Sequence, residues 1–200
     1  MQRIILASQS LRRKQLLEWA EVPFMVLTAN SEELIPENTP VEEVPIVIAR
    51  EKAEVVKSKV SNFSEGRDIK EITMPVVAAD TIVVIDNEII GKPINRQHAI
   101  ETLQRLQGRK HTVITGVVIH HNEKEVAFSV STEVEFHPLD NKQIEYYVDN
   151  YQPFDKAGAY AIQEWIGVIG VKTVNGDFYN VMGLPVSRVV YELNKLEPAE

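Results

Sequence analysis

The chain has 200 residues, 44% of them hydrophobic, and a formal net charge of −8 at pH 7. This length suits one compact α/β domain, or one domain with two lobes, and the apolar fraction suffices for a sizeable core. So acidic a composition argues against general nucleic-acid binding, which requires a basic surface. The absence of cysteine excludes disulfides, thiolate nucleophiles and cysteine metal sites.

The apolar runs of the chain are all short. The stretch near the N-terminus is too short for a signal peptide, and no run approaches the length of a transmembrane helix. We therefore expect a cytoplasmic protein with no membrane partner.

The N-terminal part of the chain predicts strands and helices in alternation. Residues 3–7 are typical of a short buried strand, and residues 11–20 of a helix capped by serine hydroxyls. A second strand is expected over 24–27. After a polar loop, a Thr-Pro-Val-Glu start predicts a helix over about 39–59.

The middle of the chain predicts longer strands. Residues 76–85 form a run of unusual apolar density, which we expect to turn into a partner strand that ends at Gly91. A helix over 95–108 follows, with asparagine and glycine at its two ends. Two long strands, over 111–120 and 125–136, come next.

The C-terminal part begins with a helix capped by Asp140 and ends with a helix opened by Pro185. Between them, Asn175-Gly176 is a strong hairpin signal and predicts that strands over 168–173 and 178–181 pair. Strands and helices thus mix irregularly, with several hairpins. We expect a mixed β-sheet with flanking helices rather than a regular doubly wound sheet.

Three consecutive basic residues, Arg12, Arg13 and Lys14, stand in the first turn of the first predicted helix. Cations there oppose the helix dipole, at a cost of a few tenths to about 1 kcal/mol each. They fit an anion bound by the helix N-terminus, the Ser8 and Ser10 hydroxyls and the guanidinium groups. The alternative is that the three side chains simply extend into water.

Lys52 and Asp80 break the apolar patterns around them. Lys52 lies in the apolar stripe of its helix, where it either runs its stem along the surface or points its charge at a phosphate. Asp80 interrupts a strand expected to be buried on both faces, and a buried aspartate is nearly always paired or bound to metal. It either satisfies backbone amides or serves as a catalytic acid at the end of a central strand.

Two glycine-containing segments complete the candidates. Gly91-Lys92-Pro93 places a lysine at a tight turn, and a solvated side chain is its simplest explanation. Residues 155–163 are mostly small and allow close approach to a ligand, and the amide of Gln163 can pair with a base edge. A packed loop explains this segment equally well.

Familiar nucleotide-binding and hydrolase motifs are absent from the sequence. It has no P-loop, no dinucleotide-binding glycine pattern, no nucleophile elbow and no H-E-x-x-H metal motif. Several cations around one buried acid therefore indicate a polyphosphate site completed by a divalent metal.

The candidate residues lie in motifs that occur together in the Maf family. In chain order these are LASQSLRR (6–13), AREKA (49–53), AADTIV (78–83), GKP (91–93), LQGRKHTVITG (106–116), DKAGAYAIQ (155–163) and NVMGLP (180–185). Each motif is weak by itself, whereas seven in register are specific. From about residue 4 to about residue 195, the chain resembles a Maf protein.

The resemblance implies a fold and a reaction. The expected fold is an elongated α/β structure similar to inosine triphosphate pyrophosphatases, with two lobes around a curved mixed sheet and a nucleotide in the cleft. The expected reaction is hydrolysis of nucleoside triphosphates to the monophosphate and pyrophosphate, with Mg²⁺ or Mn²⁺. The segment DKAGAYAIQ is similar to the branch that prefers dTTP and UTP, whereas a branch that acts on 7-methyl-GTP differs there. A homodimer is also implied.

The resemblance also implies roles for individual residues. Asp80 matches the acid that activates water or holds the metal, and Glu33 matches an acidic residue near the metal. The implied triphosphate ligands are Ser8, Arg12, Arg13, Lys52 and Lys92, and the implied base-selecting residues are Arg12, Thr81 and Gln163.

Two residues depart from the family pattern. Leu11 replaces the proline usual in the first motif, so a less rigid helix start is expected. Glu164 follows Gln163 where the family commonly has glycine. A bulky acid there is expected to reshape the base pocket and to affect the choice of nucleotide, but not the reaction.

Two other functions fit the same residues. One is a nucleotide-binding regulator of cell division or septum formation without significant turnover, which would bind nucleotide tightly and release little pyrophosphate. The other is an editing pyrophosphatase for modified bases, which a substrate panel would distinguish.

Overall fold

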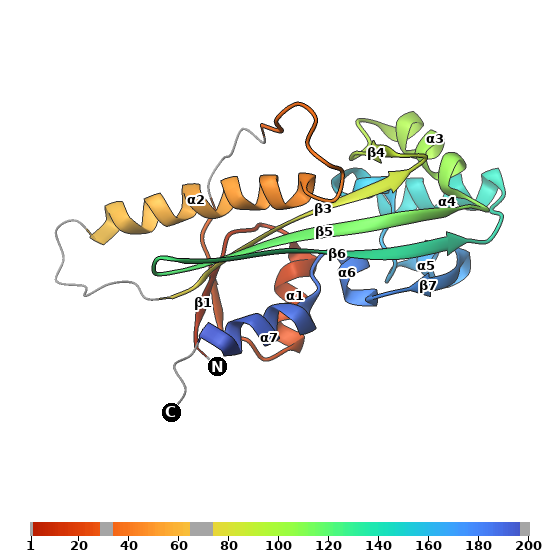
Figure 1. Cartoon of the computed structure of the whole chain (residues 1–200). Helices are drawn as coiled ribbons and strands as arrows, with labels where there is room; N and C mark the ends of the chain where they lie inside the picture. The colour runs from red at the N-terminus through yellow and green to blue at the C-terminus, as the bar shows by residue number, and fades with distance from the viewer. Residues whose placement is uncertain (1, 29–33, 65–73, 197–200) are drawn as a thin grey trace. The chain divides into compact units, whose positions relative to one another are not determined.

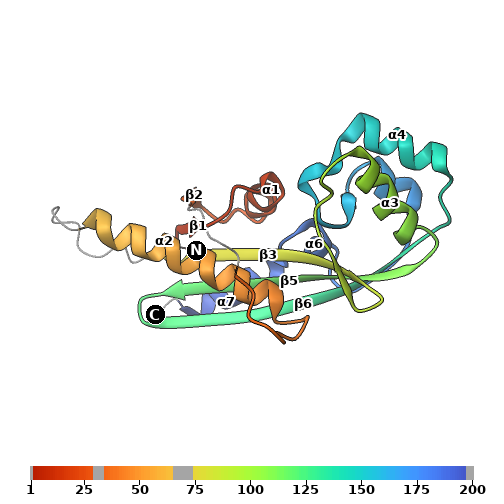
Figure 2. The same ribbon diagram turned by 90° about the horizontal axis from the view of Figure 1, so that it is seen from above.

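The computed structural model describes residues 2–28, 34–64 and 74–196 (Figures 1 and 2). The strands are β1 (Ile4–Leu6), β2 (Phe24–Val26), β3 (Val76–Ile85), β4 (Glu88–Ile90), β5 (Lys110–His121), β6 (Lys124–Phe136) and β7 (Val171–Asn175). The helices are α1 (Leu11–Trp19), α2 (Val44–Ser64), α3 (Arg96–Leu106), α4 (Asn141–Tyr151), α5 (Trp165–Gly170), α6 (Phe178–Met182) and α7 (Val186–Leu196), with 3-10 helices η1 (Pro153–Asp155) and η2 (Ala157–Ala159).

The seven strands of the described residues form one mixed sheet, in the order β2-β1-β3-β5-β6-β7 with β4 paired to β3. Strand β1 is parallel to β2 and β3, whereas β4 and β7 are antiparallel to their partners β3 and β6. The predicted mixed sheet with flanking helices is therefore confirmed.

The chain divides into two compact units. The first comprises Met1–Asp80, Thr115–Ser129 and Gly183–Glu200, and the second comprises residues 81–114 and 130–182. The boundaries fall inside β3, β5 and β6. A nucleotide cleft between two lobes stays a prediction.

Helix α2 packs closely on the sheet of the first unit. Its buried face presents Ala49, Ala53 and Val56 to apolar side chains of the strands. Those strand residues are Ile5, Ala7, Val76, Ala78 and Val118. Figure 1 shows α2 on one face of these strands and α1 and α7 on the other, so both faces are covered. This burial explains the apolar density of β3.

Strand β5 comes unusually close to the first turn of α2 at Gly116. A Cβ atom placed on Gly116 would lie 2.3 Å from the backbone nitrogen of Ile46 and 2.4 Å from the carbonyl carbon of Pro45. Both neighbours are backbone atoms of a helix that cannot move without losing its packing. The glycine that ends the LQGRKHTVITG motif is therefore required by the fold.

The core of the second unit contains a polar pair among aromatic rings. His111 Nε2 lies 2.8 Å from the Tyr160 hydroxyl, and both rings make edge contacts with Phe136. Burial lowers the pKa of His111 to about 4 and raises the pKa of the Tyr160 phenol. His111 is thus a buried core residue that is paired with Tyr160. Helix α3 lies beside α4 in both views (Figures 1 and 2) and also packs on η2.

The hairpin predicted at Asn175-Gly176 is wrong. Residues 178–182 form α6, because the Asp177 carboxylate accepts the backbone N–H of Tyr179 (2.8 Å) and so caps a helix. Strand β7 pairs with β6 instead, through Val134 opposite Val174. The strand predicted from residue 168 starts only at Val171, because α5 occupies the residues before it.

Helix α2 begins later than predicted. Val44 is its first residue, and the backbone N–H of Val44 donates to the carbonyl of Pro40 in a preceding turn (3.2 Å).

No helix among the described residues is long and apolar enough to cross a membrane.

The packing at Gly116 predicts that Gly116→Ala lowers the free energy of unfolding by about 3 kcal/mol, because the new methyl group must displace helix backbone. Urea denaturation of the two proteins measures the difference. Gly91→Ala is the matched control, since a Cβ there would meet nothing within 4 Å. Equal losses in the two variants would contradict the account of Gly116.

Burial of neutral His111 predicts that acid weakens the second unit. Because the folded pKa is about 4 and the usual value is 6.5, the stabilisation is present above pH 6.5 and is lost as the pH falls toward 4. Between pH 7 and 4.5 the wild type should lose about 2 kcal/mol more than His111→Gln. His137→Gln, at an exposed position, should keep the wild-type slope. An unchanged slope in His111→Gln would refute the assignment.

Candidate functional site

The segment after β1 turns at Ser8 into α1. The Ser10 side chain caps the helix by accepting the backbone N–H of Arg13 (3.5 Å), and the Ser10 N–H donates to the Ser8 hydroxyl (3.3 Å). The predicted serine cap is therefore confirmed. Leu11 is 78% exposed and is the first residue of the helix. The serine cap thus starts the helix without the proline usual at this position.

Arg13 is not a solvated cation. Its Nε donates to the carbonyl oxygen of Gly183 (2.8 Å) and its Nη1 donates to the Ser8 hydroxyl (3.1 Å). Burial of the guanidinium lowers the pKa of Arg13, the charge of Asp80 acts in the opposite direction, and the neighbouring Arg12 adds to the lowering. Arg13 therefore connects the start of α1 with the segment at Gly183 and lies within electrostatic reach of Asp80.

Lys52 and Asp80 form the central contact of the site. Lys52 Nζ lies 2.7 Å from Asp80 Oδ1, and the two side chains are 20% and 19% exposed. Parallel pairing of β1 with β3, with Leu6 opposite Val77, brings the turn at Ser8 alongside Asp80. Lys52 thus neither extends into water nor covers apolar surface. It pairs with the acid that interrupts the strand.

The first unit therefore gathers four of the predicted residues: Ser8, Arg13, Lys52 and Asp80. Arg12 lies close enough for its charge to act on Arg13. Among the described residues, one carboxylate and three cations lie together in a partly buried place, where charges are screened less than at the surface. This arrangement can bind a multiply charged anion and present a carboxylate to it.

Thr81, Lys92 and Gln163 belong to the second unit. Thr81 follows Asp80 in β3 and therefore points to the opposite face of the strand. Lys92 and Gln163 are exposed. Their segments are connected, because the backbone N–H of Gly158 donates to the carbonyl of Gly91 (3.2 Å). The segment 155–163 is thus a packed loop that ends in an exposed amide.

Glu33 lies outside the described residues. Within the part of the chain that is described, no group of three or more His, Asp or Glu side chains lies close enough to hold a metal by itself. The metal site expected at Asp80 and Glu33 therefore stays a prediction.

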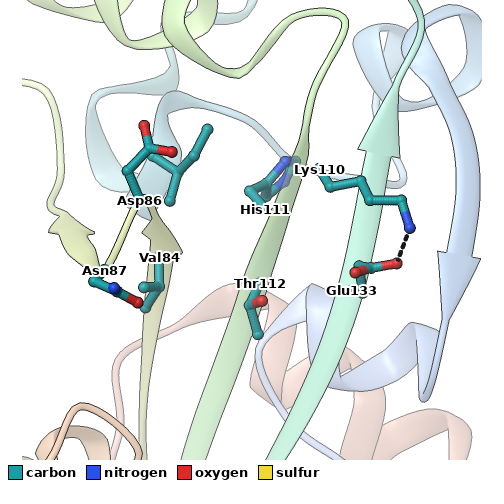
Figure 3. A pocket seen from close by; sticks show the side chains of 8 residues that line it. Val84, Asp86, Asn87, Lys110, His111, Thr112 and Glu133 are labelled. Carbon is teal, nitrogen blue, oxygen red and sulfur yellow. Dashed lines mark hydrogen bonds and ion pairs between the residues drawn. The ribbon is translucent and has the colours of Figure 1, made fainter.

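A pocket in the second unit holds none of the predicted site residues (Figure 3). Asp86 and Glu133 are among its lining residues, and Lys110 pairs with Glu133 at 2.8 Å. Asp86 in turn binds Arg109 (2.6 Å), and this hydrogen bond keeps the pKa of Asp86 below its usual value. Both carboxylates are thus paired with basic side chains, and the cations beside Asp80 in the first unit are the better match to a nucleoside triphosphate.

Sequence reasoning missed the partners that hold the predicted residues. The carbonyl oxygen of Gly183 accepts the hydrogen bond from Arg13 Nε. The backbone φ at Gly183 is +117°, a value that favours glycine. The NVMGLP motif contained this signal, although no role followed from it. Tyr147 and Lys156, the partners of Glu164, were also missed. Tyr147 carries no signal in the local sequence.

Comparison with known proteins supports one family. Residues 3–196 match the family model described as Maf-like protein. A dTTP/UTP pyrophosphatase of Cytophaga hutchinsonii is 47% identical over 193 residues, covering 96% of this chain and 84% of that protein. A dTTP/UTP pyrophosphatase of Bacteroides thetaiotaomicron is 44% identical over 194 residues, covering 96% and 95%.

Among solved structures, the Ham1 protein of Staphylococcus aureus is a partial match. The TM-score is 0.41 at 13% identity, over 68% of this chain and 72% of that chain. The assignment of a mixed sheet therefore rests on the strand pairing of this chain.

The Arg13 contacts predict that Arg13→Lys is destabilising. A lysine keeps the charge but cannot reach Ser8 and Gly183 with a planar fork, so the free energy of unfolding should fall by about 1–3 kcal/mol. Arg96→Lys is the matched control, because it alters an exposed ion pair with Asp149 and should cost less than about 1 kcal/mol. Chemical denaturation of both variants gives the comparison. Equal, small losses would show that Arg13 behaves as a surface cation.

Proposed function

This chain belongs to the Maf family, and from that premise we propose that it hydrolyses dTTP and UTP to the nucleoside monophosphate and pyrophosphate. The contact between Lys52 and Asp80, 2.7 Å apart beside Arg13 and Ser8, carries the proposal. It places one carboxylate inside a cluster of cations. Phosphoryl transfer needs this combination, since charge spreads over the phosphate oxygens during the reaction.

The cations bind and orient the triphosphate. Arg13 holds the Ser8 hydroxyl in place, so serine, arginine and lysine donors converge on one region of the first unit. Lys92 is proposed as a further phosphate ligand from the second unit. A substrate phosphate competes with Asp80 for Lys52, and the carboxylate thereby gains freedom to act on water.

Asp80 is the proposed catalytic residue. Lys52 contacts Oδ1, so the other oxygen is available, as far as the described residues go, to accept a proton from an attacking water. Water attacks the α phosphorus and the anhydride bond between the α and β phosphates breaks. Pyrophosphate then leaves, with its charge neutralised by the cations.

We also propose that Mg²⁺ or Mn²⁺ takes part. Mg²⁺ in nucleotide sites uses one or two carboxylates together with substrate phosphates and retains water, so one aspartate among the described residues fits this ion. Asp80, with Glu33, would hold it. Bound there, the ion would neutralise charge on the phosphate oxygens.

Arg12, Thr81 and Gln163 are proposed to select the base. Gln163 is exposed at the end of a packed loop, and its amide offers a donor and an acceptor to the edge of thymine or uracil. We further propose a cytoplasmic homodimer. The absence of cysteine suits a reducing compartment, and the dimer is inferred from the family resemblance alone.

A substrate panel separates this proposal from the two alternatives. An editing pyrophosphatase would favour ITP or another modified triphosphate over dTTP and UTP. A regulator without turnover would bind nucleotide tightly and release little pyrophosphate from any member of the panel.

The catalytic role predicts that Asp80→Asn lowers pyrophosphate release from dTTP by at least about a hundredfold, because the variant keeps the shape but cannot accept the proton. Binding of dTTP should persist, since the cations remain. Asp86→Asn, which removes an exposed acid in the second unit, is the control and should stay near wild-type turnover. Near wild-type turnover in Asp80→Asn would overturn the assignment.

A further inference from the structure

Glu164 is bonded to other side chains of the second unit. One carboxylate oxygen accepts the hydroxyl hydrogen of Tyr147, and the other lies 3.5 Å from Lys156 Nζ. The backbone carbonyl of Glu164 also accepts N–H groups of the first turn of α5, from Gly167 (2.9 Å) and Val168 (3.1 Å). The glutamate therefore joins a helix start, a loop and α4.

Lys156 and Tyr147 are the buried members of this network. The Lys156 side chain is 9% exposed and is paired with Asp155 (2.8 Å) as well as with Glu164. Tyr147 is fully buried and stacks on Tyr151, with ring centroids 5.0 Å apart. Its hydroxyl donates to Glu164 and accepts the backbone N–H of Ala161 (3.2 Å). A single hydroxyl thus bonds both the middle of the loop and the residue after it.

These contacts close the segment 155–163 into a fixed loop. The Lys156–Glu164 pair joins its two ends, and the Tyr147 hydroxyl holds Ala161 between them. On its other side, Gly158 has a φ of +70°, and a Cβ there would lie 2.9 Å from a methyl carbon of Val83. The loop therefore packs against β3 with no space for a larger residue.

The last residues of the loop are held against α5. A Cβ on Gly167 would lie 1.8 Å from the carbonyl oxygen of Ile162, so glycine is required for this approach. Gln163 stands between Ile162, which α5 holds, and Glu164, which Tyr147 and Lys156 hold. Its backbone is constrained on both sides, while its side chain is exposed.

We propose that Tyr147, Glu164 and Lys156 are positioning residues that fix Gln163 and thereby set the preference for dTTP and UTP. The inference rests on the proposed function, since Gln163 selects a base only if a nucleotide is the substrate. It assigns Glu164 a supporting role behind the base-selecting residue. Because charges and hydroxyls in this partly buried network satisfy one another, removal of one member takes a hydrogen-bond or ion-pair partner away from its neighbour.

The test compares Tyr147→Phe with Tyr146→Phe. Both remove one hydroxyl from neighbouring positions of α4, but Tyr146 is 50% exposed, and its ring packs on Trp165 at a tilted angle. We expect Tyr147→Phe to raise KM for dTTP and UTP roughly tenfold and to change kcat little. The preference for dTTP and UTP over CTP and GTP should become smaller. A tenfold change corresponds to the loss of about one buried hydrogen bond. Tyr146→Phe should match the wild type.

Two further variants separate positioning from general stability. Glu164→Gln keeps an acceptor for the Tyr147 hydroxyl and should retain most of the selectivity, whereas Glu164→Ala should lose it. Amide hydrogen exchange provides a readout that needs no substrate. The Ala161 N–H should exchange faster in Tyr147→Phe than in Tyr146→Phe.

The outcomes distinguish this inference from the function on which it rests. No dTTP or UTP turnover in the wild type overturns both. An active wild type with equal selectivity in Tyr147→Phe and Tyr146→Phe overturns the positioning role alone. A fall in kcat with unchanged KM ratios also contradicts it, because base selection would then be intact.

Discussion

Lys52 reaches Asp80 because α2 lies very close to the sheet. The residues next to the contact on the buried face of α2 are Ala49 and Ala53, both fully buried, and their small side chains permit a short distance between helix and strands. Gly116 permits the same approach at the start of the helix, where any Cβ would strike its backbone. The ion pair at the centre of the candidate site therefore depends on two alanines of α2 and on a glycine far from them in the sequence.

Four glycines, three of them in the family motifs, serve the packing of the chain. Gly116, Gly158 and Gly167 each allow one backbone to approach another element of the same unit, and Gly183 presents its carbonyl to Arg13. The proposed chemistry rests with the cations and Asp80. A motif such as LASQSLRR combines both kinds of residue, because Ser10 starts the helix while Arg13 holds the site together.

Much of the fold was predictable from local patterns. The buried strand Val76–Ile85 and the Asp140-capped helix follow directly from hydrophobic periodicity and capping residues. The Asn175-Gly176 hairpin failed because the side chain of Asp177 caps a helix and because β6 offers β7 a partner. A turn signal in the sequence does not specify which two strands will pair.

The site was predictable where a residue broke its local pattern, as Asp80 and Lys52 do. Their pairing was not predicted, since nothing local relates a helix position to a strand 28 residues away. The Tyr147–Glu164 contact is hidden for the same reason. Tyr147 lies in an ordinary amphipathic helix, and Glu164 drew attention only as a departure from the family pattern.

The most direct test of the central claim is to identify the bond that is cleaved. Phosphorus NMR of dTTP incubated with the protein and Mg²⁺ resolves the products as they form. The account predicts dTMP and pyrophosphate in equal amounts, from cleavage between the α and β phosphates. Formation of dTDP and inorganic phosphate, or dTTP that stays intact, would contradict it.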